Sequence, residues 1–440
     1  MRISLVLALL PFALLAGCAG DVEAPKPTLV GDIAIEPWSL PAAPGTAQPD
    51  LIVAPDGRLI LSWISSTPGR RPALQLAEWT SDRGWDPVRT VAVGNAMVVN
   101  WADTPHVATT ADRALWAHWL QKSPDNPEAY SIMLVRSMDH GMNWSAPLQV
   151  NTDAVPAEHG FVSLWAQSDS SLGLAWLDGR KRGLMESAHA GHDGAKADPT
   201  RTMTLRAAVF DGELQRSAET EIDGDTCTCC QTAAAAVPGG AVVAYRDHDS
   251  DDIRDIAVVR FDGNTWSKPD TVHADGWNMA GCPVSGPAIG ALDGRTAVAW
   301  YTAAKGENAV KLAISTDKNA RFATAAKDAS ARGTTVRDVV VDRGPAVSGR
   351  VAVALDARQI WVVWMREERN AQSLWLARYA PDLSKELQRT KLVDVRGNGR
   401  GTGTPKLALA GAAAHVVWTD VADGTPQLKG VRIVAKTAAR

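Results

Sequence analysis

The sequence predicts an all-β protein, a β-propeller whose seven blades each contain four strands. Three observations support this fold. A strand–turn–strand pattern occurs seven times, each copy ends in a large aromatic residue, and the copies recur every 54 to 69 residues. That interval fits one four-stranded blade per copy. The aromatic anchors are Trp63, Trp119, Trp176, Tyr245, Trp300, Trp364 and Trp418.

The strands of each blade follow one another in chain order. The first two strands occupy residues 50–63, 105–119, 162–176, 232–245, 287–300, 351–364 and 405–418. The third strand follows after a loop of variable length, at residues 73–78, 132–136, 203–210, 256–261, 310–315 and 373–379. Blade seven has no evident fourth strand after Val434. Residues 32–38, near the amino end, can supply this strand and close the ring.

The turn after the third strand has a repeated composition. Residues 137–144 read S-x-D-x-G-x-x-W, residues 315–322 keep that spacing with Asn319 at the glycine position, and residues 82–85 and 262–266 are shorter versions. In such a turn the Asp carboxylate can accept backbone N–H bonds, and Gly or Asn permits the bend. These turns resemble the Asp-box (BNR) repeats of sialidases and related propellers. The resemblance implies a sialidase-like fold, and because that family usually has six blades, six remains an alternative to seven.

The amino end predicts export and a lipid anchor. Arg2 precedes an apolar stretch at residues 3–15 that is too short to remain as a membrane-spanning helix, as in a removable signal. It ends in Leu-Ala-Gly-Cys at residues 15–18, which resembles the bacterial lipobox; an ordinary signal peptide with an incidental cysteine is the alternative. The resemblance implies a signal peptide at 1–17, lipidation of Cys18, a tether at 18–30 and the propeller at 31–436. Ala19 after the cysteine implies a cell-envelope protein of the outer membrane, held to the membrane by its anchor only.

Charge and composition exclude one large class of partner. The net charge is −4 and the basic residues are interspersed with acidic ones, so the chain lacks the clustered Lys and Arg of a nucleic-acid-binding protein. We expect a monomer that binds a glycan or another small ligand.

Polar side chains are predicted to gather on one face of the ring. Because the first two strands of a blade are antiparallel, residues just before the first strand and just after the anchor share a face. The residues in these positions, and in the loop that follows, are Asp103, Glu158, His159, Asp178, Arg180, Arg246, Asp247, Arg254 and Asp255. The cluster favours a ligand site; the alternative is that these charges cap strand ends or form ion pairs between blades. The long loop at 181–201 lies on the same face, as a lid or as a solvated insertion.

Four cysteines lie in the same phase of two neighbouring blades. Cys227, Cys229 and Cys230 precede blade four, and Cys282 precedes blade five. In an oxidising compartment we expect two disulfides. The alternative is a thiolate site for Cu or Zn, with His159 or Glu158 as a further ligand. Apart from that alternative, no cofactor is required.

Longer strings resemble bacterial proteins labelled exo-α-sialidase, over most of the mature chain. They include residues 100–105, 158–164, 176–180, 227–232 and 276–287. The resemblance implies three arginines around a sugar carboxylate, an acid/base Asp, and a Tyr nucleophile with a Glu partner. In this chain Arg180, Arg246 and Arg254 take the first role and Asp103 or Asp178 the second. Tyr301 and Glu158 take the third.

Two functions follow from these observations. The first is a sialidase-like envelope lipoprotein acting as an exo-glycoside hydrolase on sialic-acid-like sugars. The second is a non-catalytic propeller that binds a ligand, metal or partner protein. The family's Arg-Ile-Pro motif is absent from this chain, and Tyr245 occupies an anchor position.

Overall fold

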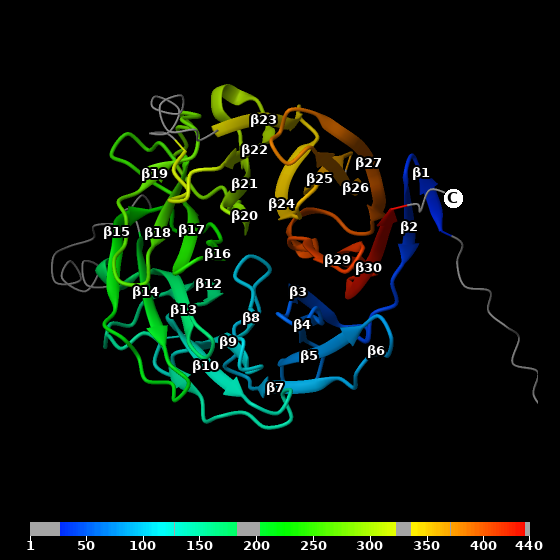
Figure 1. The fold of residues 1–440 in the computed structure, drawn as a ribbon. Helices are drawn as coiled ribbons and strands as arrows, with labels where there is room; N and C mark the ends of the chain where they lie inside the picture. The colour runs from blue at the N-terminus through cyan, green and yellow to red at the C-terminus, as the bar shows by residue number, and fades with distance from the viewer. Residues whose placement is uncertain (1–26, 127, 183–202, 323–335, 370, 436–440) are drawn as a thin grey trace, which may run out of the picture.

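The computed structural model is a ring of seven antiparallel sheets arranged around a central axis (Figure 1). It describes residues 27–126, 128–182, 203–322, 336–369 and 371–435. The prediction of seven four-stranded blades is confirmed, and the alternative of six is wrong. The predicted signal peptide, Cys18 and nearly all of the 181–201 loop lie outside the described residues. In the part that is described, no helix is long and apolar enough to cross a membrane.

The blades succeed one another along the chain, with the first strand of each against the channel. Blade 1 contains β3 (Thr46–Val53), β4 (Leu59–Ser65) and β5 (Ala73–Thr80), with β6 (Gly84–Trp85) and β7 (Arg89–Val93) both paired to β5. Blade 2 contains β8 (Val107–Thr109), β9 (Leu115–Lys122), β10 (Tyr130–Ser137) and β11 (Leu148–Gln149). Blade 3 contains β12 (His159–Ala166), β13 (Leu172–Asp178), β14 (Met203–Phe210) and β15 (Thr220–Thr226). Blade 4 contains β16 (Ala233–Val237), β17 (Gly240–Arg246), β18 (Ile256–Phe261) and β19 (Asp270–Thr271).

The second half of the ring repeats the arrangement. Blade 5 contains β20 (Ala288–Leu292), β21 (Arg295–Thr302), β22 (Ala309–Ser315) and β23 (Val336–Arg343), with the short helix η1 (Ala304–Gly306) after β21. Blade 6 contains β24 (Val347–Leu355), β25 (Ile360–Glu368), β26 (Ala371–Tyr379) and β27 (Glu386–Val395). Helix η2 (Gly399–Thr402) leads into blade 7, which contains β28 (Lys406–Ala410), β29 (Ala413–Ala422) and β30 (Thr425–Ala435).

The amino end closes the ring, as predicted. Strand β2 (Ile33–Pro37) pairs antiparallel with β30 and becomes the fourth strand of blade 7. Ile33 and Ile35 are buried in one cluster with Trp418 and Ile433, so the closure rests on apolar packing as well as on the ladder. Strand β1 (Thr28–Val30), within the range assigned to the tether, adds a further strand to this sheet (Figure 1).

The aromatic anchors fill the space between neighbouring blades. Trp176 of β13 packs with residues of blade 2, and Trp300 of β21 packs with residues of blade 4. Twisted sheets arranged around an axis diverge from one another, and a large side chain on the second strand of each blade occupies the gap between neighbouring blades. The buried indole N–H groups need acceptors: Trp176 donates to Asp178 at 2.9 Å and Trp418 donates to Asp420 at 2.8 Å. An Asp two residues after an anchor therefore satisfies the anchor itself.

The turn at residues 137–144 is held by its own side chains. The Asp139 carboxylate accepts hydrogen bonds from the Ser137 hydroxyl and the Asn143 amide, both at 2.8 Å, and the Ser137 hydroxyl accepts the Gly141 amide at 2.9 Å. Gly141 has φ of +81°, which a side chain would strain. The turn joins the third and fourth strands, so it lies on the ring face opposite the starts of the first strands.

Candidate functional site

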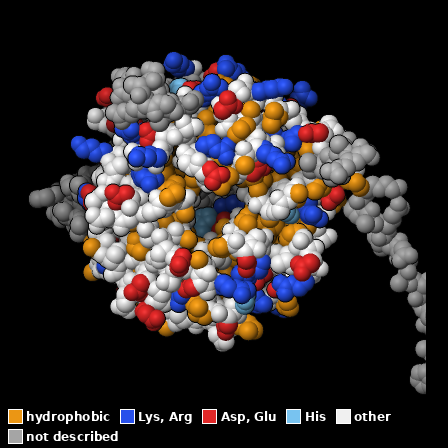
Figure 2. Space-filling model, viewed as in Figure 1, with side chains coloured by type: hydrophobic (Ala, Val, Ile, Leu, Met, Phe, Trp, Pro, Cys, Tyr) orange, Lys and Arg blue, Asp and Glu red, His pale blue; other side chains and the backbone are white. Residues whose placement is uncertain are grey.

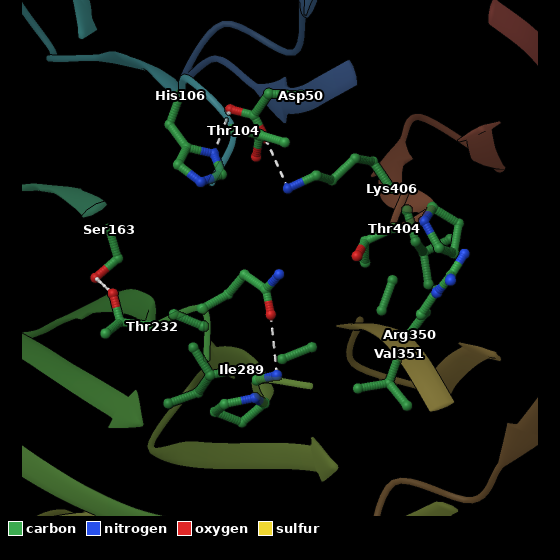
Figure 3. Close-up of a pocket in the computed structure, with 18 of the residues that line it drawn as sticks. Asp50, Thr104, His106, Ser163, Thr232, Ile289, Arg350, Val351, Thr404 and Lys406 are labelled. Carbon is green, nitrogen blue, oxygen red and sulfur yellow. Dashed lines mark hydrogen bonds and ion pairs between the residues drawn. The ribbon is translucent and has the colours of Figure 1, made fainter. Parts of the chain in front are cut away.

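The first strands of all seven blades enclose a channel cavity of about 330 Å³. Figure 2 shows the centre of the ring hollowed, with basic side chains visible inside the hollow. Figure 3 shows side chains from β3, β24 and β28 and from the segments before β8 and β16 pointing toward the same space. Each blade contributes residues of its innermost strand or of the segment just before it.

A charged group of three residues lies in the channel wall. The Asp50 carboxylate is 3.1 Å from His106 Nδ1 and 3.5 Å from Lys406 Nζ, so it joins blades 1, 2 and 7 (Figure 3). It also accepts the Val107 amide at 3.1 Å. Burial acts to raise the pKa of Asp50, but His106, Lys406 and that amide outweigh it and lower the pKa well below its usual range. Asp50 is therefore a charged carboxylate that already has its partners.

A second pocket of about 400 Å³, here called the rim pocket, adjoins the channel cavity. The two spaces share Trp101, Val284, Ser285 and Arg350. The rim pocket is also lined by Pro283, Tyr301, Asn308, Pro345, Ala346, Val347, Ser348, Glu367 and Arg400. It lies where the first strands of blades 5 and 6 begin and where the segments before blades 2 and 7 approach them.

Two arginines give the rim pocket a positive charge. The Cζ atoms of Arg350 and Arg400 lie 5.3 and 5.7 Å from the centroid of the Trp101 ring, within the range of a cation–π contact. Within the described part of the chain, neither arginine has a carboxylate at ion-pair distance. Glu367 is the only acidic residue among the described residues of the lining, and its carboxylate accepts a hydrogen bond from Gln372 at 2.6 Å. The pocket thus has two cationic groups and one acid.

Arg350 is fixed in place by its backbone and by neutral acceptors. It has φ of +52° in a bulge of β24, where the pairing skips from Gly349 to Ala352. Its guanidinium donates to the Thr402 hydroxyl at 2.7 Å and to the carbonyls of Gly399 and Gly403 at 2.6 and 3.1 Å. Burial lowers the pKa of Arg350. A bulge redirects a side chain, and here the redirected side chain is a cation at the junction of the two cavities.

The three arginines assigned to a sugar carboxylate do not line either cavity. Arg180 forms ion pairs with Asp178 at 2.7 Å, Glu219 at 2.8 Å and Asp153 at 3.2 Å. Its donors are thus directed toward carboxylates, including Glu219 beside the outer strand of blade 3. Arg180 therefore has three carboxylate partners within the folded protein.

Arg246 and Arg254 lie together between blades 4 and 5. Arg246 is 2% exposed and donates to the carbonyls of Arg254, Ser285 and Tyr301 at 2.6 to 3.1 Å. Arg254 is 3% exposed and donates to the Met279 carbonyl at 2.8 Å. Both side chains join the loops of two blades, which is the inter-blade alternative weighed from the sequence.

The predicted acid/base and partner carboxylates are also separated from the pocket. Asp103 is buried and accepts the Phe161 amide at 2.7 Å; burial, opposed by this bond, raises its pKa to about 7. Asp178 is fully buried between Trp176 and Arg180. Glu158 lies on the surface of blade 3, 3.8 Å from Arg182. Tyr301 lines the rim pocket, and none of these three carboxylates does. The structure therefore does not pair Tyr301 with Glu158.

His159, Asp247 and Asp255 have structural partners as well. His159 is 1% exposed and lies 3.1 Å from Asp153. Burial lowers the pKa of His159, but the carboxylates of Asp153 and Asp178 raise it by more, so the net effect is a raised pKa. Asp255 accepts the amides of Gly276 and Trp277 at 2.9 and 3.1 Å. Burial and the charge of Asp223 raise the pKa of Asp247 to about 7. Of the ten residues proposed for catalysis or substrate binding, Tyr301 alone lines a cavity described above.

The four predicted cysteines do come together, but without the expected disulfides. All four described cysteines are free thiols. The sulfur atoms of Cys227, Cys229 and Cys230 lie within 4.8 Å of one another, and Cys282 Sγ lies 3.1 Å from the Thr228 hydroxyl. His159 and Glu158, the further ligands considered, do not belong to this group.

Trp101 and Arg400 were placed on this face by their position before the first strands of blades 2 and 7, but Asp50, His106 and Lys406 were missed because they belong to positions that the sequence analysis treated as strand. Asp50 lies within β3, His106 just before β8 and Lys406 at the start of β28, each 12 or 13 positions before the anchor. A charged residue at the start of an otherwise apolar inner strand is a signal that could have found them. Arg350 has no such signal, because its direction depends on the bulge.

No protein-family profile matches the sequence, and no curated protein matches it. Several solved structures are similar in fold. A protein of unknown function from Dyadobacter fermentans matches with a TM-score of 0.50 and 11% identity, over 92% of this chain and 100% of that one. The phage phi92 endosialidase matches with a TM-score of 0.48 and 10% identity, over 93% and 70%. The α-L-arabinofuranosidase Arb93A of Fusarium graminearum matches with a TM-score of 0.46 and 10% identity, over 88% and 92%. At such identities the similarity concerns the propeller fold alone.

Proposed function

We propose that the protein binds the carboxylate-bearing end of a glycan, a sugar acid of the sialic-acid type, in the rim pocket. The observation that carries the proposal is the pair Arg350 and Arg400, two cations without an ion-pair partner among the described residues, in one pocket. A guanidinium matches a carboxylate with two parallel hydrogen bonds, and such charge-assisted bonds are stronger than neutral ones.

The remaining lining fits a hydroxylated ring. Tyr301, Asn308 and Ser348 offer side chains that can both donate and accept hydrogen bonds, and Pro283 and Pro345 offer apolar surface between them. The pocket volume of about 400 Å³ lies in the range of small-ligand sites. Together with the adjoining channel cavity, it has room for a sugar residue whose chain continues into solvent.

Binding without hydrolysis is the better-supported form of this function. Hydrolysis by a tyrosine nucleophile also needs a base and a proton donor for the leaving group. Among the residues that the structure describes, Glu367 alone brings a carboxylate to the pocket lining, and it cannot take both roles at once. Burial raises the pKa of Tyr301, although the charge of Arg246 opposes this, and a raised pKa makes the hydroxyl a weaker nucleophile.

Exo-acting sialoside hydrolysis is the second candidate, because Tyr301 and Glu367 line the same pocket. Its test is release of a fluorogenic aglycone from a sialoside by the full chain purified in detergent. Turnover that Tyr301→Phe abolishes would establish the hydrolase. Turnover that Tyr301→Phe leaves unchanged would remove Tyr301 from the mechanism.

The binding proposal is tested by calorimetric titration of the full chain with N-acetylneuraminic acid and, in parallel, with its methyl ester. Arg400 is exposed, so Arg400→Gln should fold normally while it loses one charge-assisted contact. Such contacts contribute about 1.5–3 kcal/mol, and we expect roughly 10- to 100-fold weaker binding of the acid. The matched control is Arg358→Gln, which removes an exposed arginine from the β24–β25 hairpin of blade 6. The proposal fails if the acid and the ester bind alike, or if the two variants lose the same affinity.

We also propose that the protein works at the cell envelope, anchored by lipid on Cys18 and probing glycans near the outer membrane. The support is the Leu-Ala-Gly-Cys sequence at residues 15–18. Incorporation of a palmitate analogue into the natural chain, and its loss in Cys18→Ser, would establish the anchor. Equal labelling of both would refute it.

A further inference from the structure

The sulfur cluster beside the rim pocket has the donor set of a soft-metal site. Cys227, Cys229 and Cys230 lie in the short segment between β15 and β16, and their sulfur atoms all lie within 4.8 Å of one another. Cys227 Sγ and Cys230 Sγ are 3.5 Å apart. The next residue, Gln231, lines the channel cavity. The cluster therefore lies directly behind the wall of the channel.

The spacing of the sulfurs suits one shared ion. Two thiolates bound to one ion at about 2.3 Å lie roughly 3.8–4.0 Å apart, in tetrahedral or trigonal geometry. Cys227 Sγ and Cys230 Sγ, at 3.5 Å, are about 0.3–0.5 Å closer than that value, and no pair of the three sulfurs is farther apart than 4.8 Å. A disulfide needs sulfur atoms about 2.05 Å apart, and all four described cysteines are free.

The surroundings carry a positive charge and a hydrogen bond to sulfur. The Ser285 amide donates to Cys230 Sγ at 3.4 Å, and the carbonyl of Ser285 accepts the Arg246 guanidinium at 2.8 Å. The Arg246 carbonyl accepts the Cys227 amide at 3.1 Å. Arg246 is 2% exposed and has no carboxylate at ion-pair distance among the described residues. An unpaired buried charge is costly, and an anionic metal–thiolate centre in contact with the same backbone would offset it.

The number of ligands favours copper over zinc. Cys282 interacts with Cys229, but it does not belong to the group of sulfurs that all lie within 4.8 Å of one another; its Sγ lies 3.1 Å from the Thr228 hydroxyl, and the residue is exposed. Structural zinc sites are almost always four-coordinate. Thiolate ligands suit Cu(I) as well as zinc, but Cu(I) is satisfied by three sulfurs in a trigonal arrangement. We propose that Cys227, Cys229 and Cys230 bind one Cu(I) ion, each thiol releasing its proton to solvent on binding.

The test is a titration of the reduced full chain with Cu(I), without oxygen, against a Cu(I) chelator of known affinity. We expect one Cu(I) per chain and X-ray absorption from a shell of sulfur alone at about 2.3 Å. Cys229→Ser and Cys230→Ser should each lose at least 100-fold in affinity. Cys282→Ser is the matched control and should bind like the natural chain. Cys229 is only half-buried, so its variant remains informative if Cys230→Ser does not fold.

Three outcomes would overturn the proposal. One is a preference for Zn(II) that disappears in Cys282→Ser, which would mean a four-sulfur zinc site. Another is equal copper binding by all the variants, which would mean adventitious binding. The third is a natural chain, isolated folded, whose four thiols are already joined in two disulfides. Binding of a sugar acid at the rim pocket is measured separately, so either proposal can fail alone.

Discussion

The buried carboxyl of Asp103 should make the stability of this protein fall as the pH rises. Asp103 is 2% exposed, and burial, opposed by the bond from the Phe161 amide, raises its pKa to about 7 from the usual 3.8. Glu158 adds a negative charge that acts in the same direction. The folded protein therefore holds Asp103 protonated at pH values where the unfolded chain ionises it. Replacing Asp103 with Asn keeps an acceptor for the Phe161 amide and removes the ionisation.

The sign and size follow from the two pKa values. A group whose pKa is higher in the folded state contributes stability that is fully present below the unfolded pKa and is lost as the pH rises through the folded pKa. Here the window runs from about pH 4 to about pH 7. The whole effect is about 4 kcal/mol, of which about 3 kcal/mol is lost between pH 5 and pH 9. Asp103→Asn should not show this loss.

The assay is urea unfolding of the full chain and of Asp103→Asn at pH 5 and pH 9. The variant should gain about 3 kcal/mol relative to the natural chain between the two pH values. Asp251→Asn is the matched control because it removes an exposed carboxylate; it should stay within about 0.5 kcal/mol at both pH values. The reasoning is refuted if Asp103→Asn and Asp251→Asn show the same pH dependence.

Two further predictions concern packing. Ile33→Ala removes three buried carbon atoms from the strand that closes the ring and should lower the free energy of unfolding, measured by urea titration, by about 2–4 kcal/mol. The control is Leu29→Ala on β1, where the side chain is 61% exposed; it should change the free energy of unfolding by less than about 0.5 kcal/mol. Equal effects of the two substitutions would mean that β2 does not close the ring. Gly160→Ala would place a methyl group 2.0 Å from the Asp103 carboxylate and should lower the melting temperature by several degrees. The control is Gly94→Ala, whose methyl group would have no atom within 4 Å and should leave the melting temperature unchanged. Equal melting temperatures of the two variants would contradict the close approach of Gly160 to Asp103.

The sequence was sufficient for the architecture because the fold is periodic. Each blade repeats an aromatic anchor at the end of the second strand, so one misread blade leaves six others in phase. The ring closure was also predictable, since blade 7 lacked a fourth strand and residues 32–38 were the free apolar segment. Strand β1 was missed, because Thr28–Val30 follow two prolines in a polar stretch with no periodic pattern.

The site was predicted only as a region. Phase along the blades placed Arg246 and the cysteines on one face, and in the structure the Cys227 amide donates to the Arg246 carbonyl. Phase cannot say which way a side chain turns or what already neutralises it. Asp178 satisfies the indole of its own anchor, and Arg180 is surrounded by three carboxylates. Those partners come from segments up to about 40 residues away, so their proximity depends on blade packing that the sequence does not display.

An irregularity of the inner strands explains why Arg350 could not be predicted from the sequence as a cavity-lining residue. In a regular strand, side chains alternate between the two faces, and a single extra residue reverses that alternation. Such an irregularity occurs in the first strands of blades 1, 3 and 6, where Gln48, Phe161 and Arg350 have φ between +51° and +58°. The same backbone feature thus carries an amide, an apolar ring and a cation in three blades. Since the feature recurs, it belongs to the blade and not to the ligand. In blade 6 it holds a cation at the junction of two cavities, so the ligand preference of this propeller can change by substitution at that position while the fold is kept.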